Sequence, residues 1–123
     1  MKISELLKRK EPSFSFEFFP PKDDKAMATL LETLSHLREL RPSFTSCTYG
    51  AGGSTREKTL MIVDRIQREH QLTGRAHLTC VNATAQQTRD ILALASALGV
   101  RNILALRGDP PGGTGEFQKT EGG

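Results

Sequence analysis

Apolar and polar residues alternate along residues 13–19, where Phe14, Phe16 and Phe18 share one face. A period of two is typical of a β-strand, and the density of aromatic side chains predicts that this strand is buried. Two prolines follow it and end it sharply, because proline cannot donate a ladder hydrogen bond. Glu17 lies on the face opposite the three phenylalanines, close to the carboxyl end of the strand.

Glu17 is therefore expected to be a carboxyl group carried on a buried strand. Burying an ionised carboxylate without partners costs so much free energy that such a group usually takes up a proton. A carboxylic acid that stays neutral near pH 7 can serve as a general acid. A solvent-facing glutamate or a structural ion pair is the alternative interpretation, and this stretch favours neither over the other.

Three longer segments carry apolar residues at spacings of three and four, which predicts amphipathic helices. They run from the acidic pair at 23–24 to about residue 40, from 54 to about 70, and from 84 to 98. Ser54 with Glu57 has the form of a capping box that opens the second helix. Thr84 with Gln87 does the same for the third, and Gly99 ends that helix as a C-terminal glycine.

Strands are predicted between these helices, at residues 44–49, 76–81 and 102–107. A short amphipathic helix is expected in the first ten residues, and residues 112–123 have no periodicity. The alternation of strands and helices describes a chain of βαβ units, which implies a parallel sheet with helices packed on it. Two architectures remain open, a doubly wound sheet and part of a (β/α)₈ barrel.

Polar side chains occupy the carboxyl ends of all four predicted strands, where both architectures bind ligands. These side chains are Glu17, Thr48, Tyr49, His77, Thr79, Arg107 and Asp109. Polar side chains at all four strand ends indicate a binding or catalytic site. Arg107 and Asp109 could instead form a surface ion pair. The glycine-rich turn at 50–53 resembles a nucleotide-binding loop only weakly, because it matches neither G-x-G-x-x-G nor a P-loop.

Composition excludes several classes of protein. The net charge of +3 comes from acids and bases that are mixed along the chain, whereas nucleic-acid binders cluster their basic residues. No apolar run approaches the length of a membrane span, and the start lacks the apolar segment of a signal peptide. Cys47 and Cys80 lie in separate apolar runs and are expected to be reduced core cysteines of a cytoplasmic protein. No metal site is expected, because His77 and Cys80 point to opposite faces of one strand.

Four short motifs, taken together and in order, resemble the methylenetetrahydrofolate reductase family. They are Ser-Phe-Glu-Phe-Phe-Pro-Pro at 15–21, Thr-Tyr-Gly-Ala at 48–51, His-Leu-Thr-Cys at 77–80 and Leu-Arg-Gly-Asp at 106–109. The resemblance extends from about residue 13 to residue 109. It implies a (β/α)₈ TIM barrel with FAD across its carboxyl face. Such a barrel takes about 250 residues, so residues 1–123 correspond to an incomplete N-terminal half with four strands and three intervening helices.

The resemblance also implies roles for individual residues. Glu17 corresponds to the catalytic acid, and Thr48 to a contact of the nicotinamide donor. Asp109 corresponds to a second functional carboxylate that contacts both flavin and folate. Contacts with FAD are implied for Tyr49, Ala51, His77, Arg107, Gly108 and Asp109.

The implied activity is reduction of 5,10-methylenetetrahydrofolate to 5-methyltetrahydrofolate, with FAD as cofactor and NADH or NADPH as hydride donor. This reaction belongs to one-carbon metabolism and methionine biosynthesis, and a cytoplasmic homo-oligomer is expected. The alternative is a non-catalytic half-barrel, arising as a fragment or truncated product, that self-associates or requires a complementary half. Unpaired strands at the edges of an open sheet favour such association.

Overall fold

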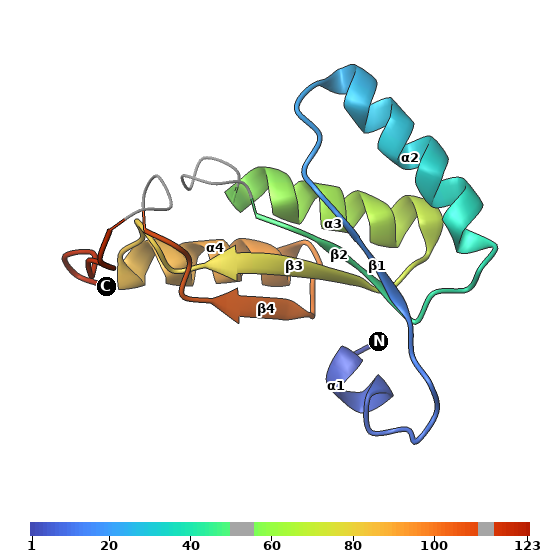
Figure 1. Ribbon diagram of the computed structural model, residues 1–123, viewed down its shortest axis with the longest axis horizontal. Helices are drawn as coiled ribbons and strands as arrows, with labels where there is room; N and C mark the ends of the chain where they lie inside the picture. The colour runs from blue at the N-terminus through green and yellow to red at the C-terminus, as the bar shows by residue number, and fades with distance from the viewer. Residues whose placement is uncertain (50–55, 111–114) are drawn as a thin grey trace.

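The computed structural model describes residues 1–49, 56–110 and 115–123 (Figure 1). Strands and helices alternate along the chain as predicted. In order they are α1 (Ile3–Leu6), β1 (Ser15–Phe18), α2 (Asp24–Arg38), β2 (Phe44–Cys47), α3 (Arg56–His70), β3 (Gly74–Thr79), α4 (Ala85–Ala97) and β4 (Ile103–Leu106). No helix in these three ranges is long and apolar enough to cross a membrane.

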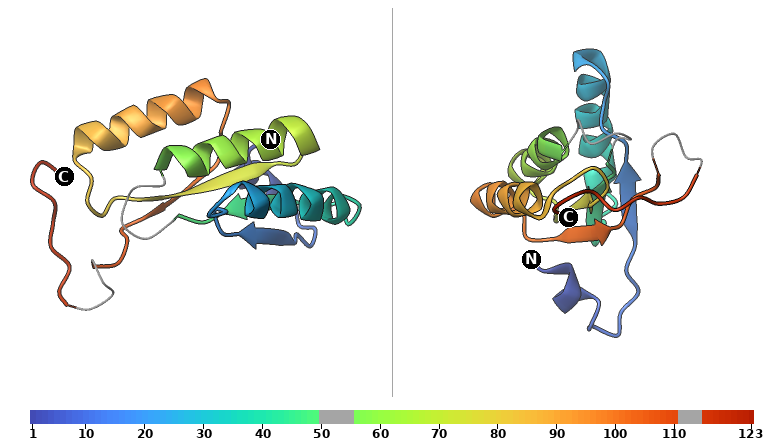
Figure 2. Two further views of the ribbon diagram at one scale, coloured as in Figure 1. Left: turned by 90° about the horizontal axis from the view of Figure 1, so that it is seen from above. Right: turned by 90° about the vertical axis from the view of Figure 1, so that its left-hand side faces the viewer.

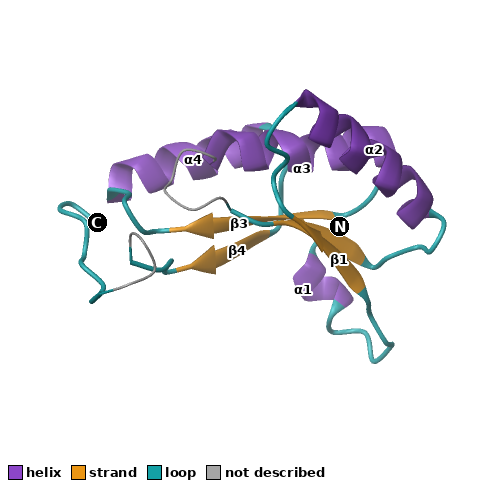
Figure 3. Cartoon of the chain, turned by 45° about the horizontal axis from the view of Figure 1, so that its top comes forward, coloured by secondary structure: helices purple, strands orange, loops and turns teal. Residues whose placement is uncertain are grey.

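The four strands form one parallel sheet in the order β1-β2-β3-β4. The long helices α2, α3 and α4 line up on one side of this sheet, and the short α1 lies on the other side (Figures 1 and 3). The view from above in Figure 2 shows α3 and α4 running beside the strands. Each helix therefore connects two neighbouring parallel strands across the same face of the sheet.

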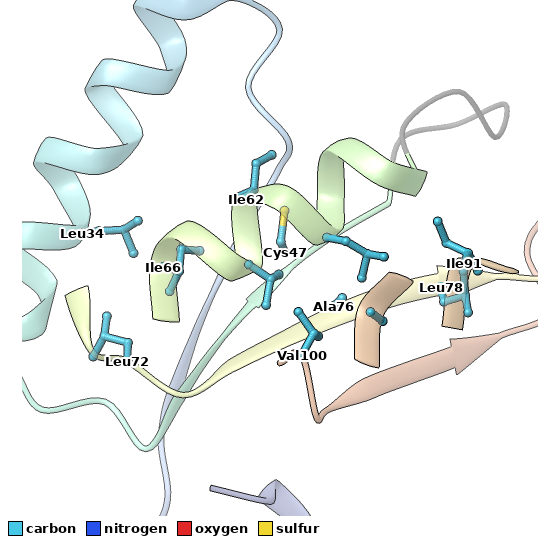
Figure 4. Close-up of a cluster of buried hydrophobic side chains, with 12 residues drawn as sticks. Leu34, Cys47, Ile62, Ile66, Leu72, Ala76, Leu78, Ile91 and Val100 are labelled. Carbon is cyan, nitrogen blue, oxygen red and sulfur yellow. The ribbon is translucent and has the colours of Figure 1, made fainter. Parts of the chain in front are cut away.

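The hydrophobic core fills the space between the sheet and the helices. Ile62 and Ile66 of α3 belong to one buried cluster with Cys47 of β2 and with Ala76 and Leu78 of β3 (Figure 4). All five side chains are buried. Because successive strand residues point to opposite faces, the place of Cys47, Ala76 and Leu78 in this cluster identifies the face of β2 and β3 that the helices cover.

Side-chain caps fix the starts of two helices. The Asp23 carboxylate accepts a hydrogen bond of 2.7 Å from the Ala26 N–H at the start of α2. The predicted capping box of α4 is confirmed, because the Gln87 N–H donates to Thr84 Oγ1 and the Thr84 N–H donates to Gln87 Oε1. Gly99 follows α4 with φ of +72°, as expected of a glycine that ends a helix. Ser54 lies outside the described residues.

The expectation that the first strand is buried is wrong. Phe14 is 51% exposed and Phe19 is 83% exposed, and Phe16 and Phe18 are half-buried. The physical reason is that β1 lies at an edge of the sheet, where β2 is its one neighbour within the described ranges. The expectation for the cysteines is half right, since Cys47 is a buried free thiol but Cys80 is an exposed one.

Asn102 joins three segments that are far apart in the sequence. Its Oδ1 accepts a hydrogen bond of 2.8 Å from the Ile3 N–H, and its Nδ2 donates to the carbonyl oxygens of Met1 and Gly74. The side chain is buried. Asn102 therefore fastens α1 to the amino ends of β3 and β4, away from the carboxyl edge of the sheet where the predicted site residues lie.

Candidate active site

The face of the sheet opposite α2, α3 and α4 carries a row of polar side chains. The register aligns Glu17 of β1 with Ser46 of β2 and Ser46 with Arg75 of β3. His77 lies two residues beyond Arg75 and so shares this face. We call this surface the open face; by register and alternation its members are Ser15, Glu17, Phe44, Ser46, Thr48, Arg75, His77, Thr79, Leu104 and Leu106.

Arg75 is held at the centre of the open face by three neighbours. Its Nε donates a hydrogen bond of 2.9 Å to Ser46 Oγ. Its guanidinium carbon lies 4.9 Å from the centre of the Phe44 ring, which is a cation–π distance. Its Nη2 lies 3.9 Å from Glu17 Oε2, and its side chain is 24% exposed. The positive charge of Arg75 is therefore fixed beside the Glu17 carboxylate.

His77 approaches the same carboxylate oxygen from the next position along β3. Its Nε2 lies 3.2 Å from Glu17 Oε2, although the contact does not have the geometry of a hydrogen bond. Burial lowers the pKa of His77, and the charge of Arg75 lowers it further, whereas Glu17 raises it. The net shift of the His77 pKa is downward, so its imidazolium releases a proton more readily than that of an ordinary histidine.

The expectation that Glu17 is buried is wrong, because its side chain is 52% exposed. Edge position accounts for the difference, because β2 is the one strand beside β1 in the part of the chain that the structure describes. Burial of Glu17 therefore gives no reason to expect a protonated carboxyl group. Two basic residues of β3, Arg75 and His77, lie beside this carboxylate instead.

Unpaired buried oxygens mark the carboxyl ends of β2 and β3. Thr48 Oγ1, Tyr49 OH and Thr79 Oγ1 are buried and have no hydrogen-bond partner among the described residues. Burying a hydroxyl without a partner costs about 1–3 kcal/mol, so native proteins rarely leave several together. Thr48 and Thr79 belong to the open face, whereas Tyr49 packs against the core cluster on the helix side. The two threonines in particular suit a polar ligand that lies across the strand ends.

The segment after β4 has a backbone that accepts glycine only. Gly108 has φ of +88°, and a Cβ built on it would lie 2.6 Å from Val81 Cγ1. The loop after β3 and the loop after β4 thus touch at this point. A third contact comes from α3, where Arg56 Nη2 donates to the carbonyl oxygens of Val81 and Asn82 at 3.0 and 3.1 Å.

Arg107 and Asp109 do not form the ion pair that their spacing allows. Arg107 stacks instead on the Phe117 ring, with its guanidinium carbon 4.6 Å from the ring centre, and its Nε donates to the Gly108 carbonyl. Asp109 is exposed. Within the described ranges no ion pair or hydrogen bond joins Asp109 to Glu17. The structure therefore brings Glu17, His77 and Thr48 to one face but leaves Asp109 at its margin.

Sequence reasoning missed Arg75, Ser46 and Arg56. The signal for Arg75 was present in the alternation of Arg75, His77 and Thr79, but the predicted strand began at residue 76 and β3 begins at Gly74. Ala51 was expected to contact the cofactor and lies outside the described residues. Among residues 1–49, 56–110 and 115–123, no group of three histidine, cysteine or acidic side chains could hold a metal ion.

The chain is similar to known proteins along most of its length. The family model described as methylenetetrahydrofolate reductase matches residues 2–123. The chain is 40% identical over 122 residues, 99% of its length, to a protein of Arabidopsis thaliana named methylenetetrahydrofolate reductase (NADH) 1. It is 41% identical over 102 residues, 83% of its length, to 5,10-methylenetetrahydrofolate reductase of Escherichia coli, and 40% identical over the same length to that of Salmonella typhimurium.

The aligned part is a minor share of each relative. The chain spans 21% of the Arabidopsis protein and 34% of each bacterial protein. The activities that these names describe therefore belong to proteins several times longer than the aligned segment.

Proposed function

The chain belongs to the methylenetetrahydrofolate reductase family, and from this premise we propose that it forms part of a flavoprotein that reduces 5,10-methylenetetrahydrofolate to 5-methyltetrahydrofolate. The hydride donor would be NADH or NADPH; the plant relatives carry NADH in their names. The reaction serves one-carbon metabolism and methionine biosynthesis. The free thiols of Cys47 and Cys80 fit a reducing compartment, and we assign the reaction to the cytoplasm.

A (β/α)₈ barrel is the architecture that we propose for the complete catalytic domain. The strand order β1-β2-β3-β4 follows the chain, and α2, α3 and α4 cover one face, as in consecutive units of a barrel. A doubly wound sheet would reverse its strand order and carry helices on both faces. Residues 1–123 would then supply the N-terminal half of a single domain, and the open face would line the inside of the barrel.

The cluster of Glu17, Arg75 and His77 on the open face is the observation that carries the proposal. The five-membered ring of the substrate must open before its methylene carbon can accept a hydride, and opening expels an amine nitrogen that needs a proton. Glu17 would supply that proton as a general acid. Its partial exposure leaves the carboxyl group accessible to a substrate that approaches the open face.

The residues at the carboxyl edge fit a bound FAD. Thr48 and Thr79 present buried hydroxyls without protein partners, which a ligand could satisfy. Thr48 would also contact the nicotinamide donor, and Asp109 would place a negative charge beside both flavin and folate. When bound, FAD would supply the hydride-transfer chemistry between donor and folate. The residues proposed to hold it are Tyr49, Ala51, His77, Arg107, Gly108 and Asp109.

The direct test is to purify the complete gene product that carries this chain. A yellow flavin spectrum, oxidation of NADH or NADPH that depends on methylenetetrahydrofolate, and chromatographic detection of 5-methyltetrahydrofolate are expected. Both nicotinamide donors should be compared at equal concentration, since neither is excluded. A folded protein that binds no flavin and forms no 5-methyltetrahydrofolate would contradict the proposed function.

Self-association of the isolated chain is a second candidate function, and the uncovered surface of β1 favours it. Phe14 and Phe19 are exposed on or beside this edge strand, and β1 and β4 each have one neighbouring strand in the described ranges. Unpaired sheet edges with exposed apolar side chains pair readily with another chain. Light scattering, a flavin absorbance spectrum and an activity assay on residues 1–123 would distinguish the two functions. A colourless oligomer supports association. A monomer that binds FAD and turns over normally contradicts it.

A further inference from the structure

Two basic side chains lie beside the Glu17 carboxylate, and only one of them can transfer a proton. Arg75 Nη2 and His77 Nε2 lie 3.9 and 3.2 Å from Glu17 Oε2. An arginine side chain does not lose its proton in a protein, so Arg75 acts as a fixed charge. A histidine gains and loses a proton near neutral pH. His77 is therefore the neighbour that can hand a proton to Glu17.

Glu17 needs such a source because its surroundings do not keep it protonated by burial. Half of its side chain faces the open side of the sheet, from which a substrate would approach. Once substrate and cofactor cover that side, bulk water no longer reaches the carboxyl group directly. His77, with a side chain only 10% exposed, lies on the protein side of the same carboxylate.

We propose that His77 supplies the proton that Glu17 delivers to the leaving amine, and that Arg75 positions this pair. The inference rests on the proposed function, because it assigns the origin of a proton that only the folate step consumes. His77 acts through Glu17 and does not touch the reacting atoms by this route. Its second ring nitrogen stays available for the cofactor contact proposed above.

The transfer moves one proton in two steps. The His77 imidazolium first turns so that its Nε2–H points at Glu17 Oε2, 3.2 Å away. The Nε2–H bond then breaks as an O–H bond forms on Glu17 Oε2. That O–H bond breaks as an N–H bond forms on the departing amine, and the electron pair of the broken ring C–N bond remains on that nitrogen until it takes up the proton. His77 is left as a neutral imidazole and Glu17 as a carboxylate. After the product leaves, a hydronium ion from solvent protonates His77 again, so that the net change is one proton moved from solvent to the amine.

The elements around His77 determine how readily it releases this proton. From β1 it meets Glu17, and on its own strand it follows Arg75. β2 contributes the neutral Ser46, and β4 places the apolar Leu104 beside His77 in register. Burial and the Arg75 charge both lower the pKa of His77, against the opposing influence of Glu17. Arg75 thus anchors Glu17 and also makes His77 the better proton donor.

The first test is a titration of the histidine ring nitrogens of residues 1–123 by NMR. Glu17→Gln should lower the pKa of His77 and Arg75→Gln should raise it, because the two variants remove opposite charges. His36 and His70, the other histidines in the chain, provide references in the same spectra. The matched control Glu32→Gln removes an exposed carboxylate on α2 and should leave His77 unchanged.

A His77 pKa that is the same in both variants as in the wild type would overturn the proposal. If one variant fails to fold, the other alone still decides, because each removes one of the two charges beside His77. An unchanged His77 pKa in the variant that folds would count against the pair.

The second test is kinetic and uses the complete protein. His77→Gln should slow the folate step at least about tenfold. In the wild type, the rate of this step should fall as rising pH deprotonates His77, and in His77→Gln this fall should be absent. A wild-type rate and pH profile in His77→Gln would overturn the proton source while leaving the proposed function intact. A wild-type protein that forms no 5-methyltetrahydrofolate would overturn both.

Discussion

The loops after β3 and β4 meet at Gly108. A side chain added there should therefore destabilise the protein. A Cβ there would lie 2.6 Å from Val81 Cγ1 on a backbone with φ of +88°. Gly99 also has a positive φ, of +72°, but a Cβ there would meet nothing within 4 Å. Gly99→Ala should cost about 1 kcal/mol of unfolding free energy from backbone strain alone.

Gly108→Ala should cost about 2–4 kcal/mol, because strain and overpacking against Val81 add. Urea denaturation of both variants measures the difference. Equal losses in the two variants would show that the loops after β3 and β4 are not in contact at Gly108.

The two cysteines should react very differently with an alkylating reagent. Burial, and to a smaller extent the charge of Glu17, raises the pKa of the Cys47 thiol to about 12, whereas Cys80 is exposed. Because the thiolate is the reactive form, iodoacetamide at pH 7.5 should label Cys80 in the native protein and Cys47 only after unfolding. Mass spectrometry of digested peptides reads both sites, with Cys80→Ser as the control. Comparable labelling of Cys47 in the native state would be inconsistent with its place in the core.

Sequence patterns located Glu17 but not its surroundings. The alternation of Phe14, Phe16 and Phe18 correctly put Glu17 on the other face of a strand, yet burial depends on which elements cover that face, and a strand's own pattern does not contain this information. Arg75 was missed for a related reason. Its partners Ser46 and Glu17 lie on different strands, and only the parallel register brings the three side chains together.

The capping box of α4 gives a prediction at the scale of one element. Thr84→Ala removes the acceptor of the Gln87 N–H and should destabilise the protein by about 1 kcal/mol. Thr33→Ala in α2 is a matched control, because the Thr33 hydroxyl only bonds the Thr29 carbonyl within an exposed helix. That change should be neutral or slightly stabilising, since alanine is the better helix former. Chemical denaturation compares the two, and a Thr84→Ala variant as stable as Thr33→Ala would refute the cap.

Helices were easier to predict than strands because their signals are local. The spacing of Leu60, Ile62, Val63 and Ile66 predicted a helix whose buried side matches α3. The first and last residues of a strand depend instead on pairing with its neighbours. β3 starts at Gly74 because Thr45 of β2 is paired with Gly74, a contact between residues 29 positions apart.

Substitution of Asn102 tests whether its hydrogen bonds hold α1 against the sheet. Asn102→Ala would leave the Ile3 N–H and the Gly74 carbonyl without this buried partner. Each unpaired buried group costs about 1–3 kcal/mol, so the variant should lose about 2–4 kcal/mol of stability. Asn102→Asp keeps the acceptor for Ile3 and loses the donor for Gly74, and it is expected to be similarly destabilised. Thermal unfolding followed by circular dichroism measures both, and an unchanged midpoint in Asn102→Ala would contradict this role.

Across the whole molecule, the order of elements was predictable and the closure of the sheet was not. Alternating strands and helices implied a parallel sheet, and the structure confirms one with sequential strand order. The choice between a barrel and a doubly wound sheet depended on which face the helices cover. The placement of α2, α3 and α4 on one side of the sheet supports the barrel that we propose (Figure 3).

Glu17→Gln in the complete protein tests the central claim most directly, because glutamine keeps the shape of the side chain and cannot donate the proton. Stopped-flow absorbance should follow reduction of the flavin by NAD(P)H and its reoxidation by methylenetetrahydrofolate as separate half-reactions, with Glu32→Gln as the control. The account predicts that the first half-reaction stays nearly intact, since it has no leaving group to protonate. The second should slow by about 10²–10⁴-fold, the usual contribution of a general acid. Equal slowing of both half-reactions, or slowing of neither, would contradict the assignment of Glu17 as the proton donor.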